Sequence, residues 1–228
     1  MRYVAVTQVL LTLLQSGDRV VGHRSVYDWT DTFLLEEAPK FSIQTIQVDT
    51  RDTQVLQNVL ASPTNVVYFE PLSNPGLDMI DVREVVAMRH VAGATVVADN
   101  IFLSPALLRP LTLEVDMVVH SATKSLCGHG DSLSGIVISN NAEFIAKLRK
   151  ARQIYGGVLS PFNAFLVLRG IETLPVRVKQ HCANAQTIAK LSHIIRQLPR
   201  SVIPVCPVIT PTKQQRIYWL VSVAWSIL

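Results

Sequence analysis

The residues best suited to do chemistry lie at two predicted strand ends. Lys124 closes the segment His120-Ser-Ala-Thr-Lys124, which follows the apolar run Met117–Val119 and precedes a loop of small residues. This pattern predicts a buried strand that opens into a turn and presents one amine. Asp99 directly follows another apolar run, Ala94–Ala98. A lysine can form a Schiff base and a carboxylate can keep a pyridinium nitrogen protonated, so this pair suits a pyridoxal 5'-phosphate (PLP) site.

Other groups suited to ligand binding also follow predicted strands. Glu70 comes directly after the apolar run Val66–Phe69, while Ser121 and Thr123 precede the lysine. The carboxyl ends of parallel strands lie along one edge of a sheet, and ligands collect there in α/β proteins. The sequence therefore predicts that these groups converge with Asp99 on a single site.

The strands that must hold these residues are short and mostly continuous apolar runs. They cover Arg19–Val21, Ile43–Val48, Val66–Phe69, Ala94–Ala98, Met117–Val119 and Gly135–Ile138. Helices are predicted at Val4–Gln15, Asp31–Ala38, Asp52–Leu60, from the cap Asp81 to Ala92, at Ala142–Gln153, and from Pro161 to about Leu198 with a kink or break at Pro175. Continuous apolar strands between helices are typical of a mainly parallel sheet covered on both faces, so the predicted fold class is α/β.

The composition is that of a well-buried globular chain. Of the 228 residues, 49% are hydrophobic and 17% charged, which argues against disorder. The formal net charge is +4, and Lys and Arg are spread out rather than clustered, which predicts no nucleic-acid partner. Cys127, Cys182 and Cys206 are too widely spaced for a metal cluster and favour a reducing compartment. We therefore expect no metal site and a cytoplasmic location.

The apolar segments near the two ends predict no membrane association. Val4–Leu14 faintly resembles a signal peptide, but Thr7, Gln8 and Thr12 interrupt it and no clear small-residue cleavage site follows. A buried helix is expected there instead. The apolar tail Ile217–Leu228 is shorter than the about 20 apolar residues that a membrane-spanning helix takes.

Five stretches, in a fixed order and spacing, carry a family resemblance. They are Ser25-Val-Tyr-Asp-Trp-Thr30, Tyr68-Phe-Glu-Pro-Leu-Ser-Asn-Pro75, Val97-Ala-Asp-Asn-Ile-Phe102, His120-Ser-Ala-Thr-Lys124 with Gly128-His-Gly-Asp131, and Gly157-Val-Leu-Ser-Pro-Phe162 with Leu168-Arg-Gly170. Together they resemble the Cys/Met-metabolism PLP-dependent enzymes, the trans-sulfuration family. This family includes methionine gamma-lyase, cystathionine gamma-lyase, cystathionine gamma-synthase and the homoserine sulfhydrylases.

The resemblance implies a fold and an assembly. It covers roughly residues 4–200 and implies a PLP fold-type I, aspartate-aminotransferase-like large domain over residues 1–198. Residues 199–228 are interpreted as a linker-like stretch and an apolar tail, where the family has a small C-terminal domain. The family's dimer of dimers implies a homo-oligomer.

The resemblance also assigns roles to individual residues. Lys124 is expected to form the Schiff base with PLP and then to move the substrate's alpha proton. Asp99 is expected to bind the pyridinium nitrogen. Tyr27 is expected to stack on the pyridine ring and to assist proton transfer. Asn74 is expected to hydrogen-bond the phenolic oxygen of the cofactor.

Two hydroxyl residues are expected to bind the cofactor phosphate, namely Ser121 and Thr123. They also have an ordinary structural explanation, because such hydroxyls commonly bond to nearby backbone groups. The other site residues have one too. A strand-end lysine is commonly a solvated charge, an aspartate caps helices or forms turns, a tyrosine packs in a loop, and Asn74 before Pro75 suits any turn. His129 is interpreted as a loop-fixing residue rather than a catalyst or metal ligand.

The sequence departs from the family pattern in four places. The family's Ser-Gly-Met phosphate loop falls on Met1-Arg2-Tyr3, and the N-terminal arm ahead of it has no counterpart. No segment after Pro199 resembles the domain that carries the family's carboxylate-binding arginine. Ser125 follows the lysine where an aromatic residue is usual, and Asp28 and Trp29 replace small residues. These departures predict a chain truncated at both ends.

The predicted function is that of a PLP-dependent carbon–sulfur lyase or transferase acting on a small sulfur amino acid. Gamma-elimination, as in methionine gamma-lyase, is the nearest match, because His181-Cys-Ala-Asn-Ala-Gln186 and Gly128-His-Gly-Asp131 are most similar to that subgroup. Three alternatives remain open. They are the activities of cystathionine gamma-synthase, cystathionine gamma-lyase or homoserine sulfhydrylase, a PLP-binding remnant with little catalysis, and a non-catalytic partner in a mixed oligomer.

Overall fold

The computed structural model describes residues 2–194, with backbone only at 2, 90–91 and 191–194. These residues fall into two compact units, one ending at Ile171 and the other beginning at Glu172. The predicted boundary between residues 198 and 199 lies outside the described residues. The first unit contains the sheet and every residue predicted for the site.

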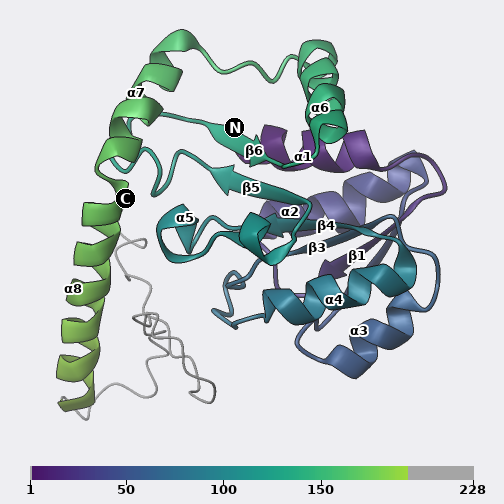
Figure 1. Cartoon of the computed structure of the whole chain (residues 1–228), viewed down its shortest axis with the longest axis horizontal. Coiled ribbons are helices and arrows are strands. Elements are labelled where there is room, and N and C mark those ends of the chain that lie inside the picture. Colours follow the sequence, from purple (N-terminus) through teal and green to yellow (C-terminus); the bar gives the residue numbers. More distant parts are fainter. Residues whose placement is uncertain (1, 195–228) are drawn as a thin grey trace. The chain divides into compact units, whose positions relative to one another are not determined.

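The first unit is built on a six-stranded sheet in the order β2-β1-β3-β4-β5-β6 (Figure 1). The strands are β1 (Arg19–His23), β2 (Gln44–Val48), β3 (Val66–Phe69), β4 (Thr95–Asp99), β5 (Met117–Ser121) and β6 (Gly135–Ile138). The first five pair in parallel, and only β6 runs antiparallel, against β5. All six predicted strands and the mainly parallel α/β class are confirmed.

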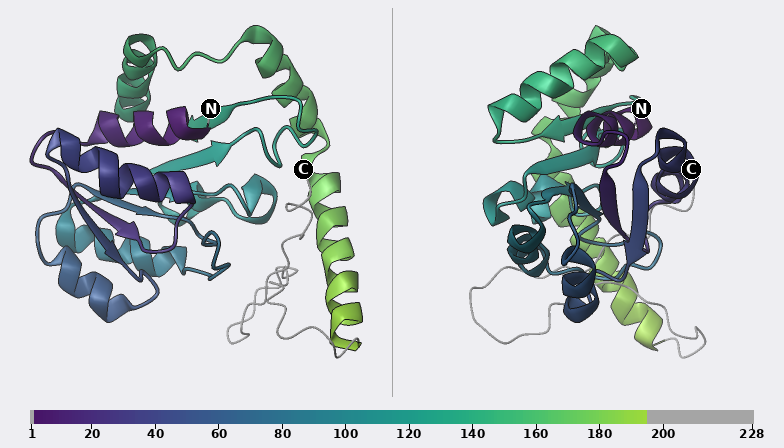
Figure 2. Two further views of the ribbon diagram at one scale, coloured as in Figure 1. Left: turned by 180° about the vertical axis from the view of Figure 1, so that it is seen from behind. Right: turned by 90° about the vertical axis from the view of Figure 1, so that its right-hand side faces the viewer.

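Helices cover both faces of the sheet, as the continuous apolar strands predicted (Figures 1 and 2). On one face lie α1 (Arg2–Leu13) and α6 (Ala142–Tyr155), and on the other lie α3 (Thr53–Leu60) and α4 (Val82–Ala92). Each strand alternates between the two cores, so that Val66 and Tyr68 face α1 while Val67 and Phe69 face α3 and α4. The buried helix predicted near the N-terminus is confirmed as α1.

Local signals explain where these helices begin and end. Asp81 caps α4 by accepting hydrogen bonds from the backbone N–H groups of Arg83 and Glu84, as predicted. Asn141 caps α6 in the same way. Gly156 ends α6 with a φ of 73°, a left-handed conformation that glycine adopts without steric cost.

The single helix predicted for Asp31–Ala38 is wrong in detail. The structure instead has α2 (Asp28–Thr32), a π-helical turn η1 (Phe33–Glu37) and a 3-10 turn η2 (Ala38–Phe41). Pro39 lacks the N–H that an α-helical bond needs, and Ser42 ends the run in the left-handed region. Two further short elements, α5 (Ser104–Leu107) and η3 (Pro110–Leu113), were not predicted.

The long C-terminal helix is interrupted close to the predicted proline. It consists of α7 (Pro161–Glu172) and α8 (Leu174–Ile194), so Pro175 lies in the first turn of α8, where its missing N–H costs nothing. The predicted end at Leu198 lies outside the described residues. Within residues 2–194, no helix combines the length and the apolar character that a bilayer crossing requires.

Candidate active site

The predicted site residues gather at the carboxyl edge of the parallel strands. Glu70 directly follows β3, and Asp99 and Ser121 are the last residues of β4 and β5. Tyr27 lies in the segment after β1. These strands are adjacent in the order β1-β3-β4-β5. The structure therefore brings together the groups that the sequence placed at separate strand ends.

Strand alternation also selects the face of the sheet. Asp99 lies two residues after Val97, and Ser121 lies two residues after Val119, and both valines belong to the core beneath α1. Glu70 likewise lies two residues after Tyr68 of the same core. Because alternate residues of a strand point to the same face, all three polar side chains project on the α1 side.

Asp99 is the best-defined polar group of the site. Its side chain is buried, with 2% of the residue exposed, and its Oδ2 accepts a hydrogen bond of 3.0 Å from the Tyr68 hydroxyl. Tyr68 is itself completely buried in β3, the neighbouring strand. The hydrogen bond fixes the orientation of the carboxylate before any ligand arrives.

Tyr68 is a site residue that the sequence reasoning missed. Tyr68 belongs to the apolar run Val66–Phe69 and opens one of the five motif stretches, and neither pattern assigns it a role. A tyrosine in a fully buried strand was nevertheless a usable signal, because a buried phenol hydroxyl nearly always needs a hydrogen-bond partner.

The segment after β5 forms a compact turn around Lys124. The Lys124 N–H donates to the Ser121 carbonyl (3.1 Å), and the Gly128 N–H donates to the Lys124 carbonyl (2.7 Å). Ser121 is buried, whereas Lys124 is half-buried. The lysine thus stands on a turn whose backbone is held on both sides, as the sequence predicted for a strand that opens into a turn.

Thr123 is engaged with the protein backbone. Its hydroxyl donates to the Ser134 carbonyl (3.2 Å) and accepts from the Ser134 N–H (2.8 Å). This is the ordinary structural role considered for Thr123, and it uses the hydroxyl hydrogen that a phosphate would need. Phosphate binding by Thr123 requires this hydroxyl to rotate away from Ser134, so that role stays a prediction.

Glu70 holds the tyrosine segment in place. Its Oε1 accepts a hydrogen bond of 3.0 Å from the Tyr27 backbone N–H, and the glutamate is buried. The Tyr27 ring is half-buried and lies 6.3 Å, centroid to centroid, from the ring of Tyr3 on α1. Tyr3 also packs edge-on against Trp29 at 5.7 Å. The sequence alone did not reveal this supporting role of Glu70.

Asn74 lies in a tight loop after β3, within residues 72–79. Leu72 pairs with Met79 across the base of this loop, and the Ser73 N–H donates to the Asp78 carbonyl (3.0 Å). A Cβ placed on Gly76 would come within 3.2 Å of the Ser25 hydroxyl oxygen, so the loop closely approaches the segment that leads to Tyr27. The loops of Asn74 and Tyr27 are therefore neighbours.

Two histidines near the strand ends have pKa values that burial lowers. Burial lowers the pKa of His120 in β5 to about 4, although a backbone hydrogen bond with Asn100 opposes the shift. Burial is also the largest cause that lowers the pKa of His23 at the end of β1.

His129 donates from Nδ1 to the Cys127 carbonyl (2.7 Å), as expected for a loop-fixing residue. Within residues 2–194, no group of His, Cys, Asp or Glu is arranged to hold a metal ion.

Comparison with known proteins decides the family. The model of the Cys/Met metabolism PLP-dependent enzymes matches residues 3–197. The chain belongs to this family. This membership agrees with the resemblance carried by the motifs and gives a context to the buried aspartate and the lysine turn.

Relatives and solved structures point to the same group of enzymes. The chain is 43% identical over 187 residues to an L-methionine gamma-lyase of Pseudomonas putida, covering 82% of this chain and 47% of that protein. It is 36% identical to a cystathionine gamma-lyase of Dictyostelium discoideum, covering 90% and 53%. A crystal structure of cystathionine gamma synthase from Xanthomonas oryzae pv. oryzae matches with a TM-score of 0.82 and 37% identity, covering 84% and 49%. The chain thus spans about half the length of these relatives.

The donor set of the site suits PLP. A pyridinium nitrogen needs a buried anion, and Asp99 is an oriented, buried carboxylate. A covalent carbonyl cofactor needs an amine, and Lys124 follows the neighbouring strand. Ser121 adds a buried hydroxyl on that same strand.

Proposed function

We propose that this chain binds PLP and contributes to a carbon–sulfur lyase or transferase reaction on a sulfur amino acid. The observation that carries the proposal is the pairing of β4 with β5, which sets the oriented carboxylate of Asp99 beside the strand that leads to Lys124. PLP, when bound, supplies an electron sink for carbanionic chemistry at the substrate. The chain's own residues must bind and orient the cofactor and move protons.

Each residue has a distinct task in this proposal. Asp99 holds a proton on the pyridine nitrogen, and the Tyr68 hydroxyl keeps the carboxylate in position for this. Lys124 attaches the cofactor and carries the substrate's alpha proton. Ser121 donates to the phosphate, and Thr123 does so after turning from Ser134.

Two loop residues complete the proposed site. Tyr27, whose backbone is held by Glu70, covers the pyridine ring and assists proton transfer. Asn74 donates to the phenolic oxygen of the cofactor. Both residues lie in neighbouring loops, which follow β1 and β3 at the carboxyl edge of the sheet.

We favour gamma-elimination of methionine among the family's reactions. Support comes from the 43% identity to an L-methionine gamma-lyase and from the segment at 181–186. Cystathionine cleavage, cystathionine synthesis and homoserine sulfhydrylation are the competing reactions. We also propose that the chain acts in a homo-oligomer and in the cytoplasm, a location supported by the wide spacing of its three cysteines along the sequence.

Visible absorbance of the purified protein with PLP tests the proposal. We expect a protein-bound band that disappears in Lys124→Ala and persists in Lys147→Ala, a control at an exposed lysine of α6. No band, or a band that survives Lys124→Ala, contradicts the cofactor assignment. Formation of a 2-oxo acid from methionine, cystathionine or cysteine then identifies the substrate. A Lys124-dependent band without turnover supports a PLP-binding chain with little catalysis.

The same assay addresses Asp99. Asp99→Asn keeps the shape of the side chain and an acceptor for Tyr68 but removes the charge. Where the wild-type chain turns over, we expect 2-oxo acid formation to fall roughly 10²–10³-fold while the protein stays folded, because the electrostatic contribution to the transition state is lost. Unchanged turnover contradicts the assigned role.

A further inference from the structure

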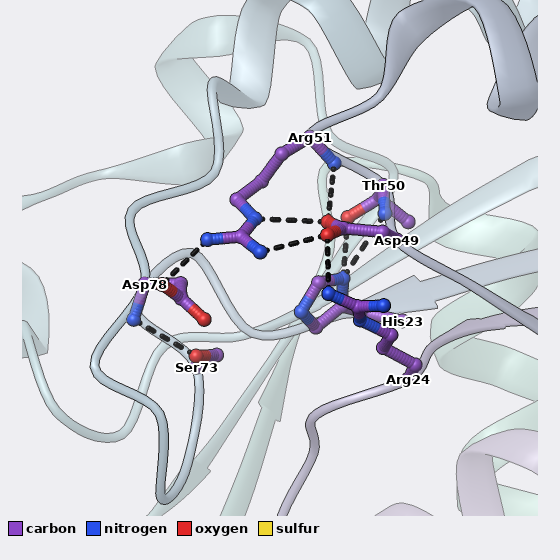
Figure 3. A network of polar contacts seen from close by, with 7 residues as sticks. All are labelled: His23, Arg24, Asp49, Thr50, Arg51, Ser73 and Asp78. Carbon is purple, nitrogen blue, oxygen red and sulfur yellow. Dashed lines mark hydrogen bonds and ion pairs between the residues drawn. The ribbon is translucent and has the colours of Figure 1, made fainter.

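Arg51 lies between two carboxylates that come from different parts of the chain (Figure 3). Its Nε and Nη2 donate to the two carboxylate oxygens of Asp49 at 2.9 Å and 2.7 Å. Its Nη1 pairs with Asp78 Oδ1 at 2.5 Å. Asp49 directly follows β2, whereas Asp78 belongs to the loop 72–79 that contains Asn74. One guanidinium therefore connects the edge of the sheet to this loop.

Asp78 is the point through which the loop is held. Its backbone N–H donates to the Ser73 hydroxyl (2.9 Å), and its carbonyl accepts from the Ser73 N–H (3.0 Å). Asn74 is the next residue, so its backbone is tied to Asp78 through Ser73. A Cβ on Gly76 would lie 2.9 Å from Asp78 Oδ2, so the loop closes tightly around this carboxylate.

The turn that carries Arg51 is held in place by a buried histidine of β1. The Nδ1 atom of the fully buried His23 accepts from the Thr50 N–H (3.1 Å) and lies 2.9 Å from the Thr50 hydroxyl. Because the backbone N–H can only donate, Nδ1 carries no proton and the neutral ring has its proton on Nε2. Thr50 lies between Asp49 and Arg51, so this contact fixes the base of the bridge.

The geometry separates Arg51 from an ordinary surface charge. Isolated pairs between exposed ions stabilise little, whereas a forked, two-point contact with a carboxylate is stronger and more specific. The Arg51 hydrogen bonds hold the pKa of Asp49 well below its usual range. Arg24 offers a contrast, because its side chain is 61% exposed, against 36% for Arg51, and its ion pair with Asp49 at 2.9 Å reaches no second carboxylate among the ion pairs of the described residues.

We propose that Arg51 is a positioning residue for the cofactor site, which fixes the Asn74 loop by bridging Asp49 and Asp78. In this proposal Arg51 acts only through the loop and contacts neither cofactor nor substrate. The inference rests on the proposed function, since it assumes that Asn74 contacts PLP. It adds a residue outside the five motif stretches to the set on which the site depends.

Hydrogen–deuterium exchange of the full chain without PLP tests the bridge itself. We expect the peptides that cover residues 72–79 to exchange about three- to tenfold faster in Arg51→Ala and in Asp78→Asn, because the loop loses its anchor. Arg24→Ala is the matched control and should leave this loop unchanged. The double variant should exchange no faster than either single variant, since both changes break one contact.

PLP titration by visible absorbance tests the consequence for the site. We expect the dissociation constant to rise about three- to tenfold in Arg51→Ala, to rise less in Arg51→Lys, and to stay unchanged in Arg24→Ala. Lysine restores only part of the effect, because an ammonium cannot hold two carboxylates in a fork. The band of the bound cofactor should also shift in Arg51→Ala as Asn74 moves.

Two results overturn the positioning role. The first is unchanged exchange of residues 72–79 in Arg51→Ala. The second is a loosened loop with unchanged PLP affinity and spectrum. A wild-type chain without a Lys124-dependent band is a different failure, because it removes the proposed function and the positioning role with it.

Discussion

The candidate site has two halves that are held in place by different forces. The inner half comprises Asp99, Ser121 and the turn that ends at Lys124, and the outer half comprises Tyr27 and Asn74. Inner residues are the last residues of parallel strands or follow them directly, so the register of β3, β4 and β5 sets their positions. Outer residues lie in loops, which are positioned by Glu70 and by the Arg51 bridge.

This difference separates what packing does from what polar contacts do. The packing of the strands in the hydrophobic core fixes the positions of the inner residues. These positions tolerate little change in side-chain volume, because protein interiors are close-packed. The outer half depends on a few hydrogen bonds and ion pairs between loops, each of modest strength. We therefore expect the largest losses of stability where a change disturbs the packing of the inner half or places a charge inside it. Changes in the outer half should cost less and should mainly make its loops more mobile.

The largest effect is expected where the Lys124 turn meets α7. A Cβ on Gly170 would lie 2.1 Å from the Cys127 carbonyl oxygen and 2.7 Å from the Cys127 Cα, so backbone rather than a flexible side chain would have to move. Gly170→Ala should lower the free energy of unfolding by about 3 kcal/mol, as measured by urea denaturation. Gly130→Ala, in the same loop with open space around it, should cost less, about 1 kcal/mol, through its positive φ alone. Equal costs would contradict the importance of this contact.

A smaller effect is expected from acid, acting on the inner half. The pKa of His120 is about 4 in the folded chain and about 6.5 when unfolded, so the unfolded state binds the proton first as the pH falls. Its contribution to stability is complete above pH 6.5 and is lost between pH 6.5 and pH 4. At pH 5 the loss should be about 2 kcal/mol, measured by denaturation at a series of pH values. His120→Gln should reduce this slope, and a slope identical to that of the wild type would assign the acid sensitivity elsewhere, first to His23.

The smallest effect is expected in the outer half. Glu70→Ala removes the acceptor of the Tyr27 N–H, and leaving that group without its bond should cost about 1–2 kcal/mol of stability. Glu70→Gln keeps a carbonyl oxygen at the same place and should cost less. Denaturation gives both values, and hydrogen exchange shows whether the Tyr27 segment opens selectively. If both variants lose the same stability, the charge of Glu70 matters more than its acceptor oxygen.

Much of the scaffold could be predicted, because its signals are local in the sequence. Short, mostly apolar runs identified every strand of the sheet, Asp81 marked a helix start, and Pro175 marked the interruption of the long C-terminal helix. The segment from Asp28 to Phe41 was predicted less well, because its helical, π and 3-10 elements have only five, five and four residues, too few to show an apolar period of their own. Phe33, Leu34 and Ala38 of this segment pack in the core beneath α1.

The candidate site divides in the same way. Its residue types and their places after strands were visible in the sequence, since Lys124 and Asp99 directly end recognisable patterns. Their partners were not. Tyr68 bonds to Asp99 across 31 positions, and Glu70 bonds to Tyr27 across 43. Such pairs follow from the order of strands in the sheet, which no local pattern encodes.

By itself, the sequence determined which side chains stand at the carboxyl ends of the strands, because apolar runs must be buried and the polar residues that follow them emerge at the sheet edge. Only the tertiary structure decided how those side chains are oriented and supported. The parallel pairing of β3 with β4 brought Tyr68 to Asp99, and the fold of residues 72–79 brought Asp78 to Arg51. The reason is physical. The tendency of a residue to be buried depends on its own type, whereas a hydrogen bond or an ion pair forms only once two distant segments lie within reach of each other.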